Sequence, residues 1–248
     1  MNRDVTGLAG ARHKAYDTLG STNAEALALA RAGERGPLWI TARTQTAGRG
    51  RRGSAWVSAP GNLFATLLLT EPSVPAVAPQ LSFVAALALH DAVSEAAPQL
   101  APSLAVKWPN DLLLGGRKLA GILIEGGSEG GFAVAIGFGV NCASHPDSTN
   151  HPATDLAANG AEVAPARMFA GLGPAMDRRL SQWRKGEGFA AIRADWLKRS
   201  ANLGRDICVR LPDRELSGRL EGLDEAGRLL LRTANGVTAV TAGDVFGL

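Results

Sequence analysis

Residues 37–70, PLWITARTQTAGRGRRGSAWVSAPGNLFATLLLT, place an arginine-rich loop between two strand-like segments, and this arrangement decides the fold. The first segment, Pro37–Thr44, is rich in β-branched and aromatic residues, and the second, Leu63–Thr70, is mostly apolar. Such runs are typical of strands, and the second is expected to be buried more deeply. The two predicted strands therefore flank the loop Gly48–Gly53.

The glycines of this loop, Gly48, Gly50 and Gly53, have the G-x-G-x-x-G spacing of a dinucleotide-binding turn. That turn must lead from a strand into a helix whose N-terminus faces a pyrophosphate. Only residues 54–61 separate the loop from the next strand, and Pro60-Gly61 lies among them, so no crossover helix fits. A dinucleotide-binding fold is therefore rejected.

The composition of the loop indicates an anion-binding site. Arg49, Arg51 and Arg52 are interleaved with glycines, which are costly to order and useless for a core. An anionic ligand would offset that cost, and Trp56 just beyond the loop could stack on a purine. Two plainer interpretations stay open: the loop could be a flexible basic turn that touches RNA, and Trp56 could be a core residue.

Hydrophobic spacing and turn residues predict the other elements of residues 1–203. Thr22 and Glu25 have capping-box spacing at the start of a helix that Gly33 is expected to end. Gly115-Gly116 is a two-residue hairpin signal, which favours an antiparallel sheet. Strands are predicted over Ala11–Leu19, Leu104–Leu114, Lys118–Glu125 and Phe132–Val140, and helices over Pro79–Ala97, Pro165–Lys185 and Glu187–Arg199.

From Asp206 the pattern changes to short alternating strands, ICVRL, LSGRLEGL, RLLLRT and VTAVTAG. Turn residues separate them, among them Pro212-Asp213 and Asn235-Gly236. A module of about forty residues is too small to be stable without packing on the rest of the chain. We therefore predict a large domain over residues 1–203 and a small all-β domain over residues 204–248.

Composition and charge exclude several classes of protein. The 248 residues are 46% apolar and 20% charged, as in ordinary globular proteins. A net charge of +3 is too small for nucleic-acid binding by the whole surface. Cys142 and Cys208 form no CxxC pair, so reduced thiols and a cytoplasmic location are expected. The charged N-terminus is unlike a signal peptide, and the longest apolar run, around Phe83–Leu89, is too short to span a bilayer, so no membrane segment is expected.

Three further motifs have plainer readings. Gly126–Gly130 matches the G-x-S-x-G nucleophile elbow, but strand-like residues follow it, which favours a hairpin turn. His145, Asp147 and His151 could ligate a metal, yet they lie in a polar loop without a fourth ligand, and a solvated loop is the simpler interpretation. Lys107 ends an apolar strand just before a proline, and such a lysine is usually a surface residue.

Five motifs follow one another along the chain: STN at Ser21–Asn23, QTAGRGRRG at Gln45–Gly53, KWPNDLLL at Lys107–Leu114, KLAGILIE at Lys118–Glu125 and GFGVN at Gly137–Asn141. Together they resemble the motifs of biotin protein ligases, over residues 11–141 and with a small β module at the end. The resemblance implies an α+β fold with a mixed, mainly antiparallel central sheet flanked by helices, like a class II synthetase. A small C-terminal SH3-like β-barrel would follow.

The resemblance implies an ATP-dependent ligase that works in two half-reactions. Biotin and ATP give biotinyl-5′-AMP and pyrophosphate, and a lysine of a biotin carboxyl carrier protein then attacks the mixed anhydride. The first step brings a carboxylate to a phosphate, so cations and Mg²⁺ must offset their repulsion. The implied partners are biotin, ATP and the carrier domain of a carboxylase.

The same resemblance gives roles to individual residues. Lys107, Arg49 and Arg51 are the expected catalytic cations, and Lys107 would bridge the biotin carboxylate and the α-phosphate. The arginine loop is expected to fold over the adenylate as a lid. The Mg²⁺ ligands stay open, with Asp111 and Glu125 as candidates. Biotin binding is expected of Ser21, Thr22, Asn23, Gln45, Arg49, Gly50, Arg51, Lys107, Gly121 and Ile122, with Gly139 beside them, and ATP binding of Arg51, Arg52, Trp56, Lys107, Asn110 and Asn141.

The chain also departs from the family pattern. Ser54 stands where many members carry another arginine, which puts the closing contact of the loop in doubt. The short stretch before Ser21 leaves no room for the DNA-binding domain of repressor-type members, so no DNA binding is expected. A lipoate or octanoate ligase is the nearest alternative, but GRGRRG with KWPND favours biotin, and Cys142 reads as a buried residue. An RNA-binding module is a more distant alternative, and the oligomeric state stays open, a homodimer included.

Overall fold

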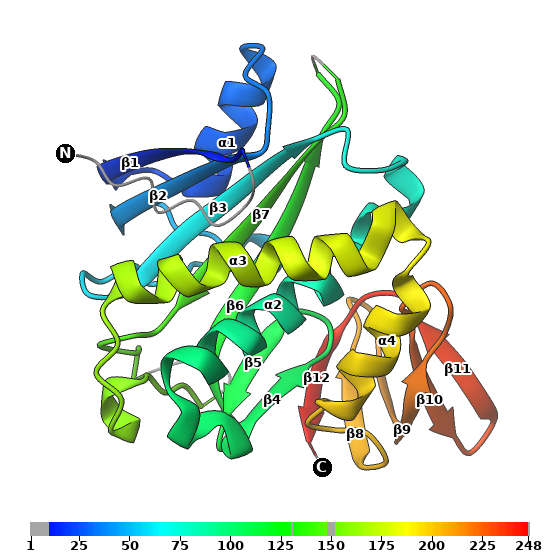
Figure 1. Ribbon diagram of the computed structural model, residues 1–248. Coiled ribbons are helices and arrows are strands. Elements are labelled where there is room, and N and C mark those ends of the chain that lie inside the picture. Colours follow the sequence, from blue (N-terminus) through cyan, green and yellow to red (C-terminus); the bar gives the residue numbers. More distant parts are fainter. Residues whose placement is uncertain (1–9, 130, 148–151, 248) are drawn as a thin grey trace.

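Seven strands form one mixed sheet in the order β1-β2-β3-β7-β6-β5-β4 (Figure 1). The structure is a computed structural model and describes residues 10–129, 131–147 and 152–247. Only β1 and β2 pair in parallel, so the prediction of a mixed, mainly antiparallel sheet is confirmed. The strands are β1 Arg12–Leu19, β2 Leu38–Gln45, β3 Leu63–Thr70, β4 Leu104–Lys107, β5 Asp111–Leu114, β6 Arg117–Gly127 and β7 Ala133–Val140.

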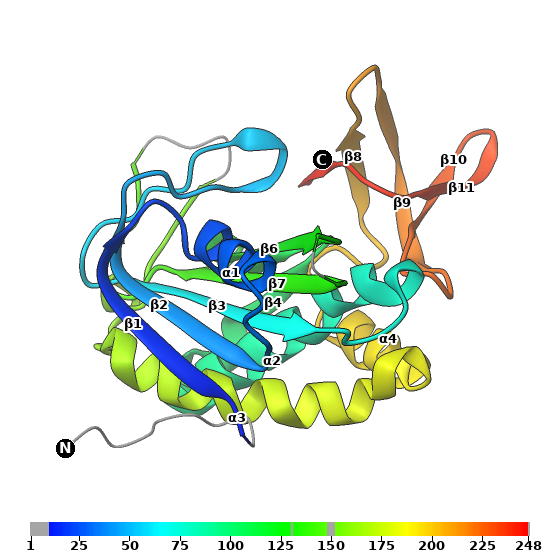
Figure 2. The ribbon, with the colours of Figure 1, turned by 90° about the horizontal axis from the view of Figure 1, so that it is seen from above.

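Helices cover both faces of this sheet (Figure 1, Figure 2). Helix α1 packs on one face over a small apolar cluster that includes Ala26, Leu38 and Leu68. Helices α2 and α3 cover the other face and enclose the main core. The α-helices are α1 Thr22–Arg31, α2 Leu81–Ala96, α3 Pro165–Trp183 and α4 Phe189–Lys198, and the short 3-10 helices are η1 Arg51–Gly53, η2 Pro75–Gln80, η3 Pro98–Ser103, η4 Ala157–Asn159 and η5 Arg184–Gly186.

The apolar helical stretch around α2 is longer than the sequence pattern suggested. By length and composition alone, Pro75–Ala96 could cross a membrane. In the structure 67% of its most apolar 18-residue window is buried. Because a helix that is apolar on all sides can be enclosed in a core, this burial accounts for its composition.

The start of α1 differs by one residue from the prediction. Ser21, not Thr22, is the N-cap, and its Oγ accepts from the backbone N–H of Ala24 at 3.5 Å. Glu25 does not complete a capping box, since its carboxylate accepts from the hydroxyl of Tyr16 at 3.0 Å. The predicted end is confirmed, because the helix stops at Arg31 and Gly33 follows with φ +92°.

The stretch Leu104–Leu114 is two strands, so the prediction of one continuous strand is wrong. Strands β4 and β5 pair antiparallel, with Lys107 opposite Asp111, and the chain reverses at residues 108–110. Proline lacks the N–H that a strand interior needs, which explains the break at Pro109. The next turn was predicted correctly: Gly115 and Gly116 have φ of 57° and 79° and join β5 to β6.

The turn between β6 and β7 confirms the hairpin reading of residues 126–130. These strands pair antiparallel from Ala120 opposite Val140 to Gly127 opposite Ala133. A nucleophile elbow needs a helix after the turn, and a strand follows instead. Residue 130 itself lies outside the described residues.

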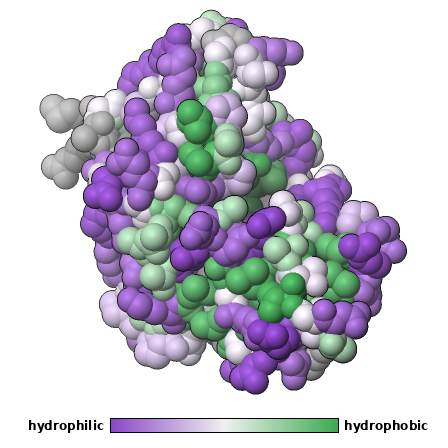
Figure 3. Space-filling model, turned by 90° about the vertical axis from the view of Figure 1, so that its right-hand side faces the viewer, coloured by the Kyte–Doolittle hydropathy of each residue, from purple (hydrophilic) through white to green (hydrophobic). Residues whose placement is uncertain are grey.

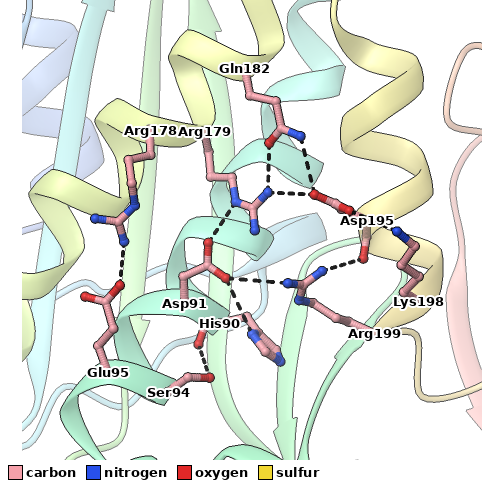
Figure 4. A network of polar contacts seen from close by, with 10 residues as sticks. All are labelled: His90, Asp91, Ser94, Glu95, Arg178, Arg179, Gln182, Asp195, Lys198 and Arg199. Atoms are coloured by element: carbon pink, nitrogen blue, oxygen red, sulfur yellow. Dashed lines mark hydrogen bonds and ion pairs between the residues drawn. The ribbon is translucent and has the colours of Figure 1, made fainter.

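A charged network joins the three helices on the α2 side of the sheet (Figure 4). Arg179 of α3 reaches Asp91 of α2 at 2.8 Å and Asp195 of α4 at 2.9 Å. Arg199, just after α4, donates to the backbone oxygen of Asp195 at 3.0 Å. The carbonyl of Arg199 then accepts from the N–H of Val106 at 2.9 Å. The network therefore anchors the segment after α4. This segment bonds to strand β4 and leads into the C-terminal module.

The C-terminal module is an antiparallel sheet in the order β11-β10-β9-β8-β12. Strand β12 was missed, because the last predicted strand ended at Gly243. Apolar residues of the module, such as Ile207 and Leu229, belong to the same core as α2, and Trp108 donates its indole N–H to the carbonyl of Gly227 at 3.2 Å. Figure 3 shows apolar side chains gathered between polar margins on the side that carries this module. The strands are β8 Asp206–Arg210, β9 Glu215–Leu223, β10 Leu229–Thr233, β11 Gly236–Val240 and β12 Asp244–Gly247.

Candidate active site

A cavity of about 640 Å³ lies beneath the arginine loop. Its walls come from the start of α1, the end of β2, the loop, the facing strands β6 and β7, and β12 of the C-terminal module. This volume is in the range of small-molecule sites, which are about 300–1,000 Å³. The cavity therefore lies where the sheet, the loop and the C-terminal module meet.

Glycines form the floor of the cavity. Gly121 of β6 and Gly139 of β7 are register partners, and the indole of Trp56 lies against both. A Cβ on Gly121 would come within 2.9 Å of Trp56 Cζ3, and one on Gly139 would be closer still to the same ring. Strand glycines mark places of close approach, as expected for Gly121. A side chain at either glycine would therefore exclude the Trp56 ring from this position.

A hydrogen-bonded amide forms one wall. Gln45 Oε1 accepts from the backbone N–H of Thr22 at 2.9 Å and from its hydroxyl at 3.1 Å. Gln45 Nε2 donates to Ser58 Oγ at 3.1 Å. These bonds fix which end of the Gln45 amide faces which neighbour, so the wall presents fixed polar groups.

A second chain of polar contacts runs behind this wall to the loop. Thr66, fully buried in β3, donates to Asn23 Oδ1 at 2.7 Å. Asn23 Nδ2 donates to Glu125 Oε2 at 2.8 Å, and Glu125 forms an ion pair with Arg49 at 3.1 Å. Buried polar groups are costly unless they are bonded, so this chain fixes its members in place. Thr66 was not among the predicted site residues, because its only signal in the sequence is a hydroxyl inside an apolar strand.

The arginine loop has a defined backbone. The N–H of Gly50 donates to the carbonyl of Ser54 at 2.7 Å, and that of Trp56 to Gly48 at 2.9 Å. Arg52 adopts a left-handed conformation with φ 53°, followed by Gly53 with φ 75°. Such a conformation in a non-glycine residue costs energy and is typical of functional sites. The loop is therefore an ordered turn rather than a featureless basic segment.

Two arginines of the loop, Arg51 and Arg52, contact the C-terminal module. Arg51 donates to Asn110 Oδ1 at 3.1 Å and to the carbonyl of Gly243 at 2.8 Å. Arg52 forms an ion pair with Asp244 at 3.0 Å. Burial lowers the pKa of Arg51 from its usual value, and the carboxylate of Asp244 opposes that shift. Arg51 thus connects the loop with the turns that precede β5 and β12.

Lys118 enters the cavity, whereas Lys107 does not line it. Lys118 Nζ forms an ion pair with Asp111 Oδ1 at 2.7 Å, although the geometry is not that of a hydrogen bond. It also lies 5.6 Å from the Trp56 ring centroid. Lys107 Nζ lies 5.8 Å from the ring centroid of Phe246. Burial lowers the pKa of Lys107, which the nearby carboxylate of Asp111 counteracts in part. Lys118 was not among the predicted site residues, although it has the same signal as Lys107, a lysine in an apolar strand.

The C-terminal module adds three side chains that sequence analysis missed: Arg210, Asp244 and Phe246. The Arg210 guanidinium lies 4.7 Å from the Phe246 ring centroid, and its Nε donates to Glu215 at 2.7 Å. The hydrogen bond from this arginine lowers the pKa of Glu215. Nothing in the sequence of the module marks these residues, because only its docking brings them to the cavity.

The structure brings nearly all the predicted site residues together. One cavity is lined by Ser21, Thr22, Asn23, Gln45, Arg49, Gly50, Arg51, Arg52, Trp56, Asn110, Asp111, Gly121, Ile122, Gly139 and Asn141. Lys107 lies outside this lining, and Glu125 reaches it through Arg49. Asn141 is buried and donates to the carbonyl of Thr154 at 3.0 Å. Ser54 also lines the cavity, and its hydroxyl donates to the carbonyl of Arg51 at 2.9 Å.

The remaining candidates have other partners. His145 Nδ1 lies 2.5 Å from Asp155, and no cluster of metal-ligating side chains occurs among the described residues. His151 lies outside them. Cys142 is buried, and burial raises its pKa to about 12. A thiol with so high a pKa is a poor nucleophile, which agrees with the reading of Cys142 as a buried residue.

Two family models match the chain. The biotin/lipoate A/B protein ligase family matches residues 21–141, and the biotin protein ligase C-terminal domain matches residues 203–247. Together they span strands β2–β7 of the sheet, the arginine loop and the C-terminal module. The fold and site therefore define a ligase of the biotin and lipoate class.

Individual relatives narrow this class. The biotin–[acetyl-CoA-carboxylase] ligase of Paracoccus denitrificans is 46% identical over 91% of this chain and 96% of its own length. That of Mycobacterium tuberculosis is 34% identical over 91% of this chain and 85% of its own length. The biotin protein ligase of Aquifex aeolicus in complex with biotin and ATP has a similar fold, with a TM-score of 0.81, 24% identity, and coverage of 95% and 97%. The chain belongs to the biotin protein ligase family.

Proposed function

We propose that the cavity beneath the arginine loop binds biotin and ATP and that the protein joins biotin to a lysine of a biotin carboxyl carrier domain. The observation that carries this proposal is the convergence of the five family motifs on one cavity. The names of the relatives support biotin as the acid and a carboxylase as the target. A cytoplasmic location is proposed with it, since both cysteines are free and ATP is the second substrate.

The first half-reaction needs a carboxylate and a phosphate to meet. The biotin carboxylate attacks the α-phosphorus of ATP, the bond to the β-phosphate breaks, and biotinyl-5′-AMP and pyrophosphate form. Arg49, Arg51 and Lys118 surround the cavity and would offset the negative charge of both groups. Because Lys118 lines the cavity, we assign it the bridging role that the sequence suggested for Lys107. Lys107, beside Phe246, would then act on the phosphates from the side of the module.

The ligands would divide the cavity between them. Gln45 and Thr22 present fixed donors and acceptors suited to the ureido ring of biotin. Trp56 and Asn141 would hold adenine, one by stacking and the other by hydrogen bonding. In the second half-reaction the carrier lysine attacks the carbonyl of the anhydride, forms an amide and releases AMP. The arginine loop would keep water from this carbonyl until then.

The carboxylates near the cavity fit a Mg²⁺ ion that is held mainly by ATP. Mg²⁺ usually keeps several waters and takes one or two carboxylates together with substrate phosphates. Asp111 is buried at the cavity and, among the described residues, pairs with Lys118 alone, whereas Glu125 is held by both Arg49 and Asn23, so Asp111 is the better candidate. The ion would neutralise charge on the phosphates.

The domain boundary is likewise a proposal: a catalytic domain over residues 1–203 and the small β domain over residues 204–248. The C-terminal family model, which begins at residue 203, supports it. The alternatives are less well supported. A lipoate or octanoate ligase with a nucleophilic cysteine does not fit the buried Cys142. An RNA-binding loop would not need the contacts of Arg49 and Arg51 with buried polar groups.

Pyrophosphate release tests the choice of acid. The protein is incubated with ATP and Mg²⁺ and with either biotin or lipoate, and pyrophosphate is measured over time. We expect release with biotin and little with lipoate. Release with lipoate alone would overturn the proposal.

A further inference from the structure

The arginine loop is tied to the C-terminal module through one carboxylate. Asp244 Oδ2 lies 3.0 Å from Arg52 Nη1, and its Oδ1 lies 3.6 Å from Arg51 Nη2. Arg51 also donates to the carbonyl of Gly243 at 2.8 Å. The two ends of these contacts are 192 residues apart in sequence. Neither the sequence motifs nor the predicted domains indicated that residues 51–52 would meet residues 243–244.

Asp244 stands on a rigid part of the module. It is the first residue of β12 and pairs with Arg210 of β8. The preceding residue is Gly243, where a Cβ would come within 2.6 Å of Val209 Cγ1. The turn before β12 is therefore seated tightly on the module's own core. The loop, with three glycines among six residues, is the partner that can move.

The opposite side of the loop is held by the sheet. Arg49 pairs with Glu125 of β6 at 3.1 Å, and Asn23 fixes Glu125 by a hydrogen bond of 2.8 Å. The loop is thus pinned by one carboxylate from each module. Opposite charges at these distances favour the closed position over an open one, although each exposed pair is worth little alone.

We propose that Asp244 is a positioning residue that latches the arginine loop to the C-terminal module and so keeps the bound adenylate from leaving or meeting water. The role of the latch in retaining the adenylate rests on the proposed function. The latch itself needs no ligand. The latch makes the small module part of the lid, since Asp244 of β12 supplies the carboxylate that contacts both Arg51 and Arg52.

Hydrogen exchange of the ligand-free protein tests the latch directly. The backbone amides of residues 48–56 are followed by mass spectrometry in the unmodified protein and in Asp244→Asn. Because the substitution removes the charge and keeps the size, we expect the loop amides to exchange about threefold to tenfold faster. Asp213→Asn is the matched control: this carboxylate is on the same module and pairs with Arg214 at 3.6 Å, away from the cavity, so loop exchange should not change.

A second variant separates the latch from general stability of the module. Arg52→Gln removes the other partner on an exposed loop and should loosen the loop to a similar extent. The double variant should be no looser than Asp244→Asn alone, because that substitution already removes the contact with Arg52. Unchanged loop exchange in both single variants would overturn the proposal. Equal acceleration throughout β8–β12 in Asp244→Asn would also overturn it, since Asp244 would then stabilise the module rather than the loop.

The functional consequence has its own measurement. Purified protein loaded with biotinyl-adenylate is diluted, and the half-life of the retained adenylate is recorded. We expect a several-fold shorter half-life in Asp244→Asn and restoration in Asp244→Glu. A normal half-life despite a loosened loop would refute the retention role. A loosened loop in a protein that makes no adenylate would instead refute the proposed function and leave the latch standing.

Discussion

Three strand glycines shape the cavity at the level of single residues. Gly121 and Gly139 lie under the ring of Trp56, and Gly137 leaves room for the amide of Asn23. Any side chain at these positions would occupy the space that a ring or an amide now fills. The floor of the site is therefore made by the absence of side chains.

Gly139→Ala should harm ligand binding far more than folding. The added methyl would push the Trp56 ring off the floor, and overpacking typically costs about 1–3 kcal/mol, so the KM of ATP should rise about tenfold or more. Initial rates of pyrophosphate release at varied ATP would measure it. Gly222→Ala is the matched control, because a Cβ there has no neighbour within 4 Å. An unchanged KM in Gly139→Ala would remove Trp56 from the nucleotide site.

Lys118→Ala should slow adenylation by on the order of 10²-fold, as loss of a preorganised charged donor does. Lys107→Ala should cost less, since Lys107 does not line the cavity. Single-turnover formation of the adenylate compares the two variants. Lys198→Ala, at an exposed position on α4, serves as the control. The reverse order of effects would restore the bridging role to Lys107.

The sequence predicted most of the residues that line the cavity. It did not predict that Lys118, and not Lys107, would be the lysine in that lining. Lys107 and Lys118 have the same local signal, a lysine in an apolar strand. Their directions depend on the β4–β5 reversal at residues 108–110, which the pattern of apolar residues did not reveal. Arg210 and Asp244 could not be predicted at all, because their role depends on how two modules dock.

At the level of elements, periodicity predicted the long helices and the central strands and failed where short strands meet. Strands β3 and β7 pair along their full length, and both have the continuous apolar runs expected of buried strands. Strand β12 has only four residues and follows a turn after β11, so its pattern is too short to stand out. Such a strand is specified by its pairing with β8 rather than by its own residues.

The network around Asp91 should stabilise the packing of α2, α3 and α4. Burial alone would raise the pKa of Asp91, but the nearby His90 ring and the hydrogen bond from Arg179 outweigh it and hold this pKa below its usual value. A carboxyl whose folded pKa is depressed adds stability above its unfolded pKa and loses it as the pH falls through the folded pKa. This contribution should therefore be complete near neutral pH and disappear in acid.

Asp91→Asn should lower the free energy of unfolding at about pH 7 by roughly 1–3 kcal/mol, because Arg179 loses one of its carboxylate partners. Below about pH 3 the difference from the unmodified protein should shrink. Urea unfolding at both pH values measures it. Glu95→Gln is the control, since Glu95 pairs with Arg178 on the exposed surface of the same helices. A difference that does not depend on pH would show that Asp91 acts without its charge.

At the scale of the whole molecule, the two modules behave as one unit. Residues of both belong to one apolar core, and both line the cavity. The β4 edge is tied by the bond between Val106 and Arg199 to the segment after α4, which leads into the module. The composition and turn pattern predicted a small dependent β module. They did not predict that it would supply part of the site.

The central claim is that this cavity joins biotin to a carrier lysine, and transfer measured on an intact carrier tests it most directly. A purified biotin carboxyl carrier domain and a variant with its target lysine changed to arginine are incubated with the protein, ATP, Mg²⁺ and biotin, and their masses are measured. The account predicts that the unmodified carrier gains the mass of one biotinyl group and that the lysine variant gains none. An unmodified mass in both, with ATP and biotin present, would contradict it.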